Sequence, residues 1–159
     1  MHLDGLALLQ QKKKPFFAKS YHPWRNFSSF EQLKLRMAIE KRRAEKVHSN
    51  SAIIFLKSKF LLASDGVQQP VRIEEVALLV CATIRITDVV SIYRNPTILI
   101  FLADTNIPGA QVACKRIVNK IIERYSYNRP WTYNDFHIKM ISFPYNTPGS
   151  SKLEWAVPA

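Results

Sequence analysis

Short apolar runs and longer amphipathic stretches alternate along this chain from residue 51 onward. The run SAIIFLK over residues 51–57 is too short for a buried helix, so it predicts a strand. Residues from Pro70 to about Arg85 repeat apolar positions at helical spacing and predict a helix that opens on a proline. Val89–Tyr93 and Ile98–Leu102 are β-branched or aromatic runs separated by four turn residues, which predicts a β-hairpin.

Three further elements flank this central part. Ser28 and Ser29 can cap a helix over about 29–47, whose apolar positions form a partial stripe: Phe30, Leu33, Leu35, Met37 and Ile39. Asn106 and Pro108 open another helix that runs to about Arg124. Residues 136–143 alternate apolar and polar side chains at their start, as in a half-buried strand.

The order of these elements predicts an α+β fold. An N-terminal helix precedes strand, helix, strand, strand, helix and strand, which is the ferredoxin-like βαββαβ unit: an antiparallel sheet with helices packed on one face. We expect residues 1–26 to form an irregular basic arm or linker, 27–145 the domain, and 146–159 an irregular tail. This fold serves polymerase palms, nucleotidyl cyclases and RNA-binding modules, so it does not by itself give the function.

The net charge of the chain indicates which kinds of partner it can attract. A formal net charge of +11 over 159 residues attracts polyanions such as nucleic acid, anionic lipid or phosphorylated ligands, although a solvated basic face explains it equally well. Aromatic residues between arginines, such as Trp24, Tyr127 and Trp131, lie in expected loops, which favours packing over base stacking.

Other chemistry is sparse. Cys81 and Cys114 lie in apolar helices, which indicates buried packing roles in a reducing compartment. The four histidines have no zinc-ligand spacing, and no glycine-rich phosphate loop or nucleophile motif occurs, so we expect no catalytic residues, no metal and no cofactor. The apolar run at residues 6–9 is too short for a signal peptide or a membrane span, so a cytoplasmic location is expected.

The segment RITDVVSIYRNPTILIFLADTNIPGAQVACKRI resembles the central portion of the diguanylate cyclase (GGDEF) domain. In that family Arg-x-x-Asp is followed by five residues, the Gly-Gly-Asp/Glu-Glu-Phe signature, an apolar strand, a Pro-Asp-Thr-like turn and a helix. Arg85 and Asp88 match the first element, Val89–Tyr93 match the spacing, and residues 103–105 resemble the turn. The likeness extends over about residues 29–145 and implies a nucleotidyl cyclase palm-like fold in a bacterial signalling protein.

The catalytic positions of the family are not retained. The signature falls on Arg94, Asn95, Pro96, Thr97 and Ile98, none of which conforms. The family's first strand ends in Asp-x-Asp-x-Phe; here Phe60 aligns, but Leu56 and Ser58 replace the aspartates. Because magnesium needs oxygen ligands and phosphoryl transfer needs the metal, the resemblance implies a domain that is not an enzyme.

The resemblance also implies a binding site. In the family the Arg-x-x-Asp pair, assisted by an arginine on the following helix, binds the product cyclic di-GMP; Arg85, Asp88 and Arg116 occupy these positions. Arginine forks match guanine and phosphate acceptors, and a carboxylate accepts from guanine N–H groups. A plain ion pair between Arg85 and Asp88, three residues apart near a helix end, is the structural alternative.

The expected function is therefore a catalytically inactive GGDEF-like signalling domain that acts as a cyclic di-GMP receptor. Two alternatives stay open at this point. One is a structural pseudo-cyclase that binds a protein partner, and the other is a basic nucleic-acid-binding protein of ferredoxin-like fold.

Overall fold

The computed structural model describes residues 25–58, 61, 71–94, 96–126 and 130–144. Expectations about most of the basic arm, Phe60, Pro70, Asn95, Tyr127 and the tail after residue 145 lie outside this part of the chain. The elements follow the predicted order: α2 (Phe30–Val47), β1 (Ser51–Ser58), α3 (Ile73–Thr83), β2 (Val89–Tyr93), β3 (Thr97–Leu102), α4 (Ile107–Tyr125), a short 3₁₀ turn η2 (Tyr133–Asp135) and β4 (Phe136–Phe143).

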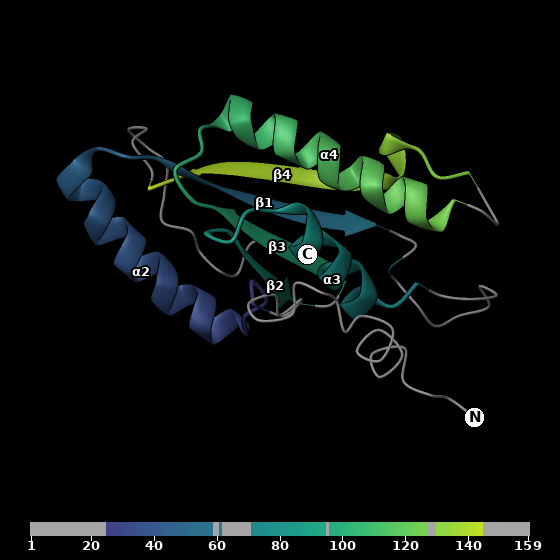
Figure 1. Ribbon diagram of the computed structural model, residues 1–159, viewed down its shortest axis with the longest axis horizontal. Helices are drawn as coiled ribbons and strands as arrows, with labels where there is room; N and C mark the ends of the chain where they lie inside the picture. The colour runs from purple at the N-terminus through teal and green to yellow at the C-terminus, as the bar shows by residue number, and fades with distance from the viewer. Residues whose placement is uncertain (1–24, 59–60, 62–70, 95, 127–129, 145–159) are drawn as a thin grey trace, which may run out of the picture.

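The four strands form one antiparallel sheet in the order β2-β3-β1-β4 (Figure 1). The predicted hairpin pairs Val89 with Phe101 at its open end and Tyr93 with Thr97 at its tip. A short segment before α2 continues the sheet beyond β2, because Phe27 bridges Val90 in parallel. The α+β class and the βαββαβ arrangement predicted from the sequence are thus confirmed.

Local sequence explains where the two long helices begin. The Ser29 hydroxyl accepts a hydrogen bond from the Gln32 backbone N–H at 3.2 Å and caps α2 as predicted. The Asn106 side chain accepts from the Gly109 backbone N–H at 2.8 Å and caps α4, with Pro108 in its first turn. α3 begins at Ile73, three residues after the proline at which the sequence pattern opened it.

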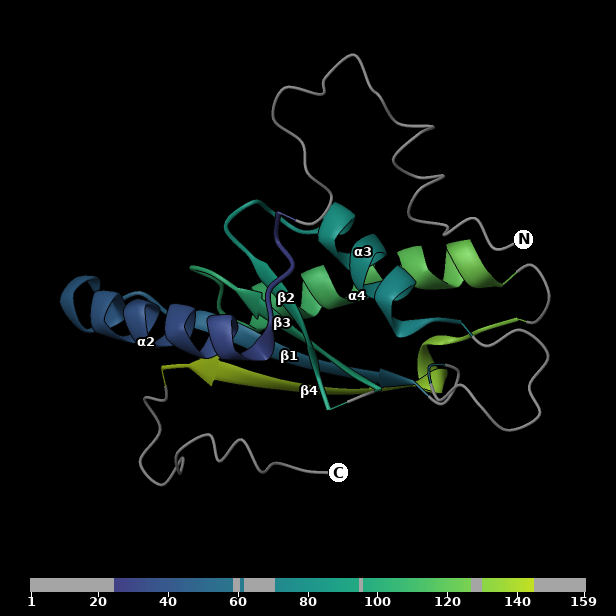
Figure 2. The ribbon, with the colours of Figure 1, turned by 90° about the horizontal axis from the view of Figure 1, so that it is seen from below.

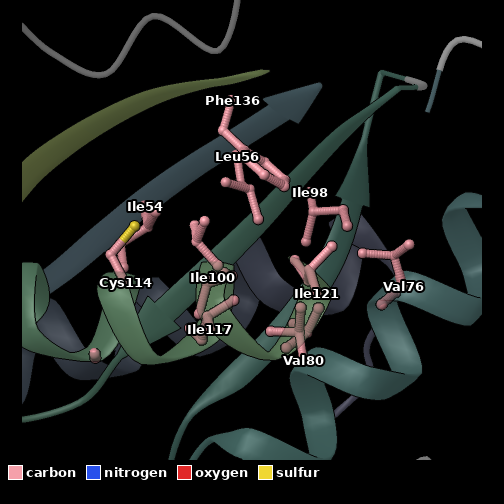
Figure 3. Close-up of a cluster of buried hydrophobic side chains, with 14 of the residues drawn as sticks. Ile54, Leu56, Val76, Val80, Ile98, Ile100, Cys114, Ile117, Ile121 and Phe136 are labelled. Atoms are coloured by element: carbon pink, nitrogen blue, oxygen red, sulfur yellow. The ribbon is translucent and has the colours of Figure 1, made fainter. Parts of the chain in front are cut away.

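The main core lies between the sheet and the pair α3 and α4, which Figure 2 shows together on one side of the sheet. Figure 3 shows side chains of both helices pointing toward residues from β1, β3 and β4; the labelled members are Ile54, Leu56, Val76, Val80, Ile98, Ile100, Cys114, Ile117, Ile121 and Phe136. Burying each large aliphatic side chain stabilises the fold by about 1.5–3 kcal/mol, so this layer dominates its stability.

A second core lies on the other face of the sheet, beneath α2. Leu33 and Met37 of the helix pack with Ile53, Phe101 and other residues of the sheet. Of the predicted apolar stripe of α2, Leu35 and Ile39 face solvent, with 68% and 62% of their surface exposed. The partial stripe therefore does not coincide with the buried face, because the face of α2 that meets the sheet is completed by Glu40 and Ala44.

Candidate functional site

The Arg-x-x-Asp pair lies in the turn that joins α3 to β2. Asp88 is 2% exposed, and both of its carboxylate oxygens are used inside the protein. Oδ2 accepts from the Arg85 backbone N–H at 3.0 Å and from the Arg85 Nε at 3.3 Å. Oδ1 accepts from the Arg85 Nη2 at 3.3 Å and from the Ala103 backbone N–H at 3.0 Å. Asp88 thus joins the turn before β2 to the end of β3.

The Arg85 guanidinium is held in a fixed position by the same contacts. Its Nη2 also donates to the Ala103 carbonyl at 2.6 Å and to the Thr105 hydroxyl at 2.8 Å. The side chain is nevertheless 56% exposed, and within the described ranges its Nη1 donates to no protein acceptor. An oriented guanidinium with free outer N–H groups can bind a phosphate or another anion with little loss of side-chain freedom.

α2 supplies a second charged cluster beside this turn. Arg36 donates to the carbonyl of Thr87, between Arg85 and Asp88, at 3.4 Å. Glu40 is only 7% exposed and accepts from Arg36 Nε at 3.2 Å and from Arg43 at 3.3 Å. These residues were not predicted from the sequence. Their spacing of three and four residues places them on one side of the helix, which was the available signal.

Arg116, the third predicted ligand residue, lies exposed on α4. Ile107 and Gln111 line the flank of α4 that faces β4. Helical spacing places Arg116 on the opposite flank, which is the side of the neighbouring helix α3. Among the described residues, no hydrogen bond or ion pair joins Arg116 to Arg85 or Asp88. The structure therefore assembles Arg85 with Asp88, and places Arg116 as a separate exposed cation.

The degenerate signature hairpin lies at the other end of the sheet. Arg94 has a φ of 42°, its carbonyl accepts from the Thr97 N–H at 3.0 Å, and its guanidinium lies 5.4 Å from the centre of the Tyr93 ring. Thr97 pairs with Lys57 of β1, so the hairpin tip and the end of β1 lie side by side, as the resemblance implies.

The residues at this end do not fit a divalent metal ion. Leu56 has no oxygen donor and is fully buried, Ser58 is buried and carries no charge, and Pro96 has only a backbone carbonyl. In the described part of the chain, no group of three histidine, cysteine or acidic side chains is arranged to hold a metal ion. We therefore derive no metal-dependent step for this end of the sheet.

The two cysteines are free and buried, as the sequence predicted. Burial raises the pKa of the Cys81 thiol to about 12. Burial likewise raises the pKa of Cys114, against the opposite effect of its hydrogen bond with Tyr133. Because the thiolate is the reactive form, both residues pack as neutral groups at physiological pH.

No protein-family model matches this sequence, and no curated protein matches it. Solved structures do match. A diguanylate cyclase protein of Thermotoga maritima is 18% identical with a TM-score of 0.58, covering 77% of this chain and 86% of that one. The GGDEF domain of TpbB from Pseudomonas aeruginosa is 14% identical with a TM-score of 0.59, covering 79% and 76%.

A third matching structure was solved in complex with c-di-GMP. The coiled coil and GGDEF domain of DgcB from Caulobacter crescentus, in complex with c-di-GMP, is 11% identical with a TM-score of 0.51, covering 87% of this chain and 72% of that one. None of the helices in the described ranges combines the length and apolar character that crossing a membrane requires. At these levels of identity the likeness concerns the backbone, and the chain has the fold of the GGDEF domain.

Proposed function

We propose that this chain is a GGDEF-fold domain that recognises cyclic di-GMP and carries out no cyclase reaction. The observation that carries the proposal is the state of Arg85, whose guanidinium is fixed by Asp88, Ala103 and Thr105 while more than half of its side chain stays exposed. Such a group suits the phosphate oxygens and guanine acceptors of a cyclic dinucleotide.

Arg85 and Asp88 have different roles in the proposed site: Arg85 contacts the ligand, and Asp88 does not. Asp88 is buried, and its oxygens already accept four hydrogen bonds, so we assign it the task of orienting Arg85. Arg116 is the proposed second contact, since it is exposed on the α3 side of α4. Leu56, Ser58 and Pro96 stand where the family has acidic metal ligands, and this supports the proposal that the domain does not catalyse the cyclase reaction.

Isothermal titration calorimetry of the full chain with cyclic di-GMP tests this function. We expect binding in the micromolar range or tighter. Arg85→Ala should weaken it by about tenfold or more, because each charge-assisted hydrogen bond is worth about 1.5–3 kcal/mol, and Arg116→Ala should weaken it less.

Arg124→Ala is the matched control, because it removes the same charge from an exposed position on α4. It should leave the affinity unchanged. The absence of heat across the micromolar range, or an equal loss in Arg85→Ala and Arg124→Ala, would overturn the proposal.

A further inference from the structure

The two edges of the sheet differ in whether their outer backbone groups have partners. Beside β2, the chain just before α2 supplies backbone partners: Ser28 donates to the Val90 carbonyl at 2.8 Å, and Val90 donates to the Asn26 carbonyl at 2.7 Å. β4 forms the other edge, and in the described ranges no further strand pairs with its outer side. Alternate residues of an edge strand direct backbone N–H and C=O groups outward, so β4 can accept an additional strand.

An open groove follows this edge on the α4 side of the sheet. It has a volume of about 610 Å³ and lies between Ile138 and Met140 of β4, Ile107 and Gln111 of α4, and Tyr133 and Asn134 of η2. Ile138 and Met140 alternate along β4 and are only partly buried. A strand added to β4 would therefore place every second side chain over this groove, beside the apolar side chains of Ile138 and Met140.

The other side of β4 is basic. His137 and Lys139 are exposed, and Lys57 of β1 pairs directly with His137. Within the described part of the chain none of these three side chains forms an ion pair with a carboxylate. Opposite charges on neighbouring strands stabilise a sheet and like charges destabilise it. A second copy of this chain, which would bring the same basic side chains, is therefore a poor occupant of this edge.

We propose that the outer edge of β4 binds an extended segment of a partner protein in which acidic and apolar side chains alternate. The segment adds one strand to the sheet, its apolar side chains enter the groove beside α4, and its carboxylates face His137 and Lys139. Binding by strand addition takes affinity from the backbone and specificity from the alternate side chains. The proposal does not rest on recognition of cyclic di-GMP.

A direct probe is a fluorescent, end-capped peptide of eight residues that alternates glutamate and valine, titrated into the full chain by anisotropy. We expect saturable binding, and at least about fivefold weaker binding of the matching lysine–valine peptide, because it places like charges opposite the basic residues. Hydrogen exchange measured by NMR should slow for the outward-facing backbone amides in residues 137–142 when the glutamate peptide is bound, because the inward-facing ones already bond to β1.

Charge reversal gives the sharpest variant. The double substitution His137→Glu and Lys139→Glu should exchange the preference, so that the lysine–valine peptide binds more tightly than the glutamate–valine peptide. Lys41→Glu together with Lys46→Glu on α2 is the control: it also introduces two acidic residues, and it should retain the original preference. An unchanged circular dichroism spectrum checks that each variant is folded.

Several results would overturn the proposal. These are an absence of peptide binding to the folded protein, equal binding of both peptides, or slowed exchange outside β4. Outward-facing amides of residues 137–142, which do not bond to β1, would show that another segment occupies the edge if they are already protected in the free protein. Displacement of the peptide by a single-stranded oligonucleotide, with no preference between the two peptides, would assign the basic face to nucleic acid instead.

Discussion

The two ends of β3 lie about 17 Å apart and differ in the charged groups around them. At the end near Leu102, Asp88 and Glu40 are buried carboxylates, and each is held by hydrogen bonds to arginines. At the end near Thr97, the neighbouring positions Leu56, Ser58 and Pro96 offer no carboxylate, and the charged neighbours Lys57 and Arg94 are cations. The comparison shows that one sheet can hold an ordered arginine at one end and, at the other end, buried positions without carboxylates.

Substitution of Asp88 should have the largest effect on stability. Asp88→Ala leaves the buried N–H of Ala103 without its acceptor and frees Arg85, so we expect the free energy of unfolding in urea to fall by about 2–4 kcal/mol. Asp104→Ala is the control at the same end of the sheet, because Asp104 is exposed and, within the described residues, its side chain pairs only with Arg43, at 3.4 Å. Its cost should stay below about 1 kcal/mol. Equal costs for the two substitutions would contradict the role given to Asp88.

Substitution at the hairpin tip should have a small effect. Arg94 is exposed, and its described contact is with the face of the Tyr93 ring. Arg94→Ala should therefore change the free energy of unfolding by no more than about 1 kcal/mol, and alanine keeps the same positive φ, so backbone strain is not relieved. Urea unfolding checks the stability. The affinity for cyclic di-GMP, measured by calorimetry, should stay unchanged. A loss above 2 kcal/mol would mean that the tip has a structural role like that of the Asp88 turn.

The sequence allowed the elements to be predicted well, because their signals are local. Ser29 and Asn106 mark helix starts by side-chain capping, and the turn between Tyr93 and Ile98 separates two β-branched runs. The structural resemblance to GGDEF domains followed from the spacing between Arg85 and the hairpin.

The surroundings of the site could not be predicted in the same way, because they depend on contacts distant in sequence. Asp88 accepts from Ala103, fifteen residues away, and Arg36 reaches Thr87 across 51 residues. The same reason explains the exposure of Leu35 and Ile39. An apolar stripe indicates a face of a helix, but only the packing of α2 on the sheet decides that Glu40, with its two arginines, takes the buried place.

Turnover of GTP tests the difference between the two ends of the sheet most directly. The full chain should be incubated with radiolabelled GTP and either Mg²⁺ or Mn²⁺, with an active GGDEF cyclase as the positive control. We predict that GTP stays intact and that no cyclic di-GMP forms, because the described residues at the hairpin end offer no carboxylates to hold the metal ions. Formation of cyclic di-GMP by the purified chain, at a rate that follows the amount of this chain through purification, would contradict the account.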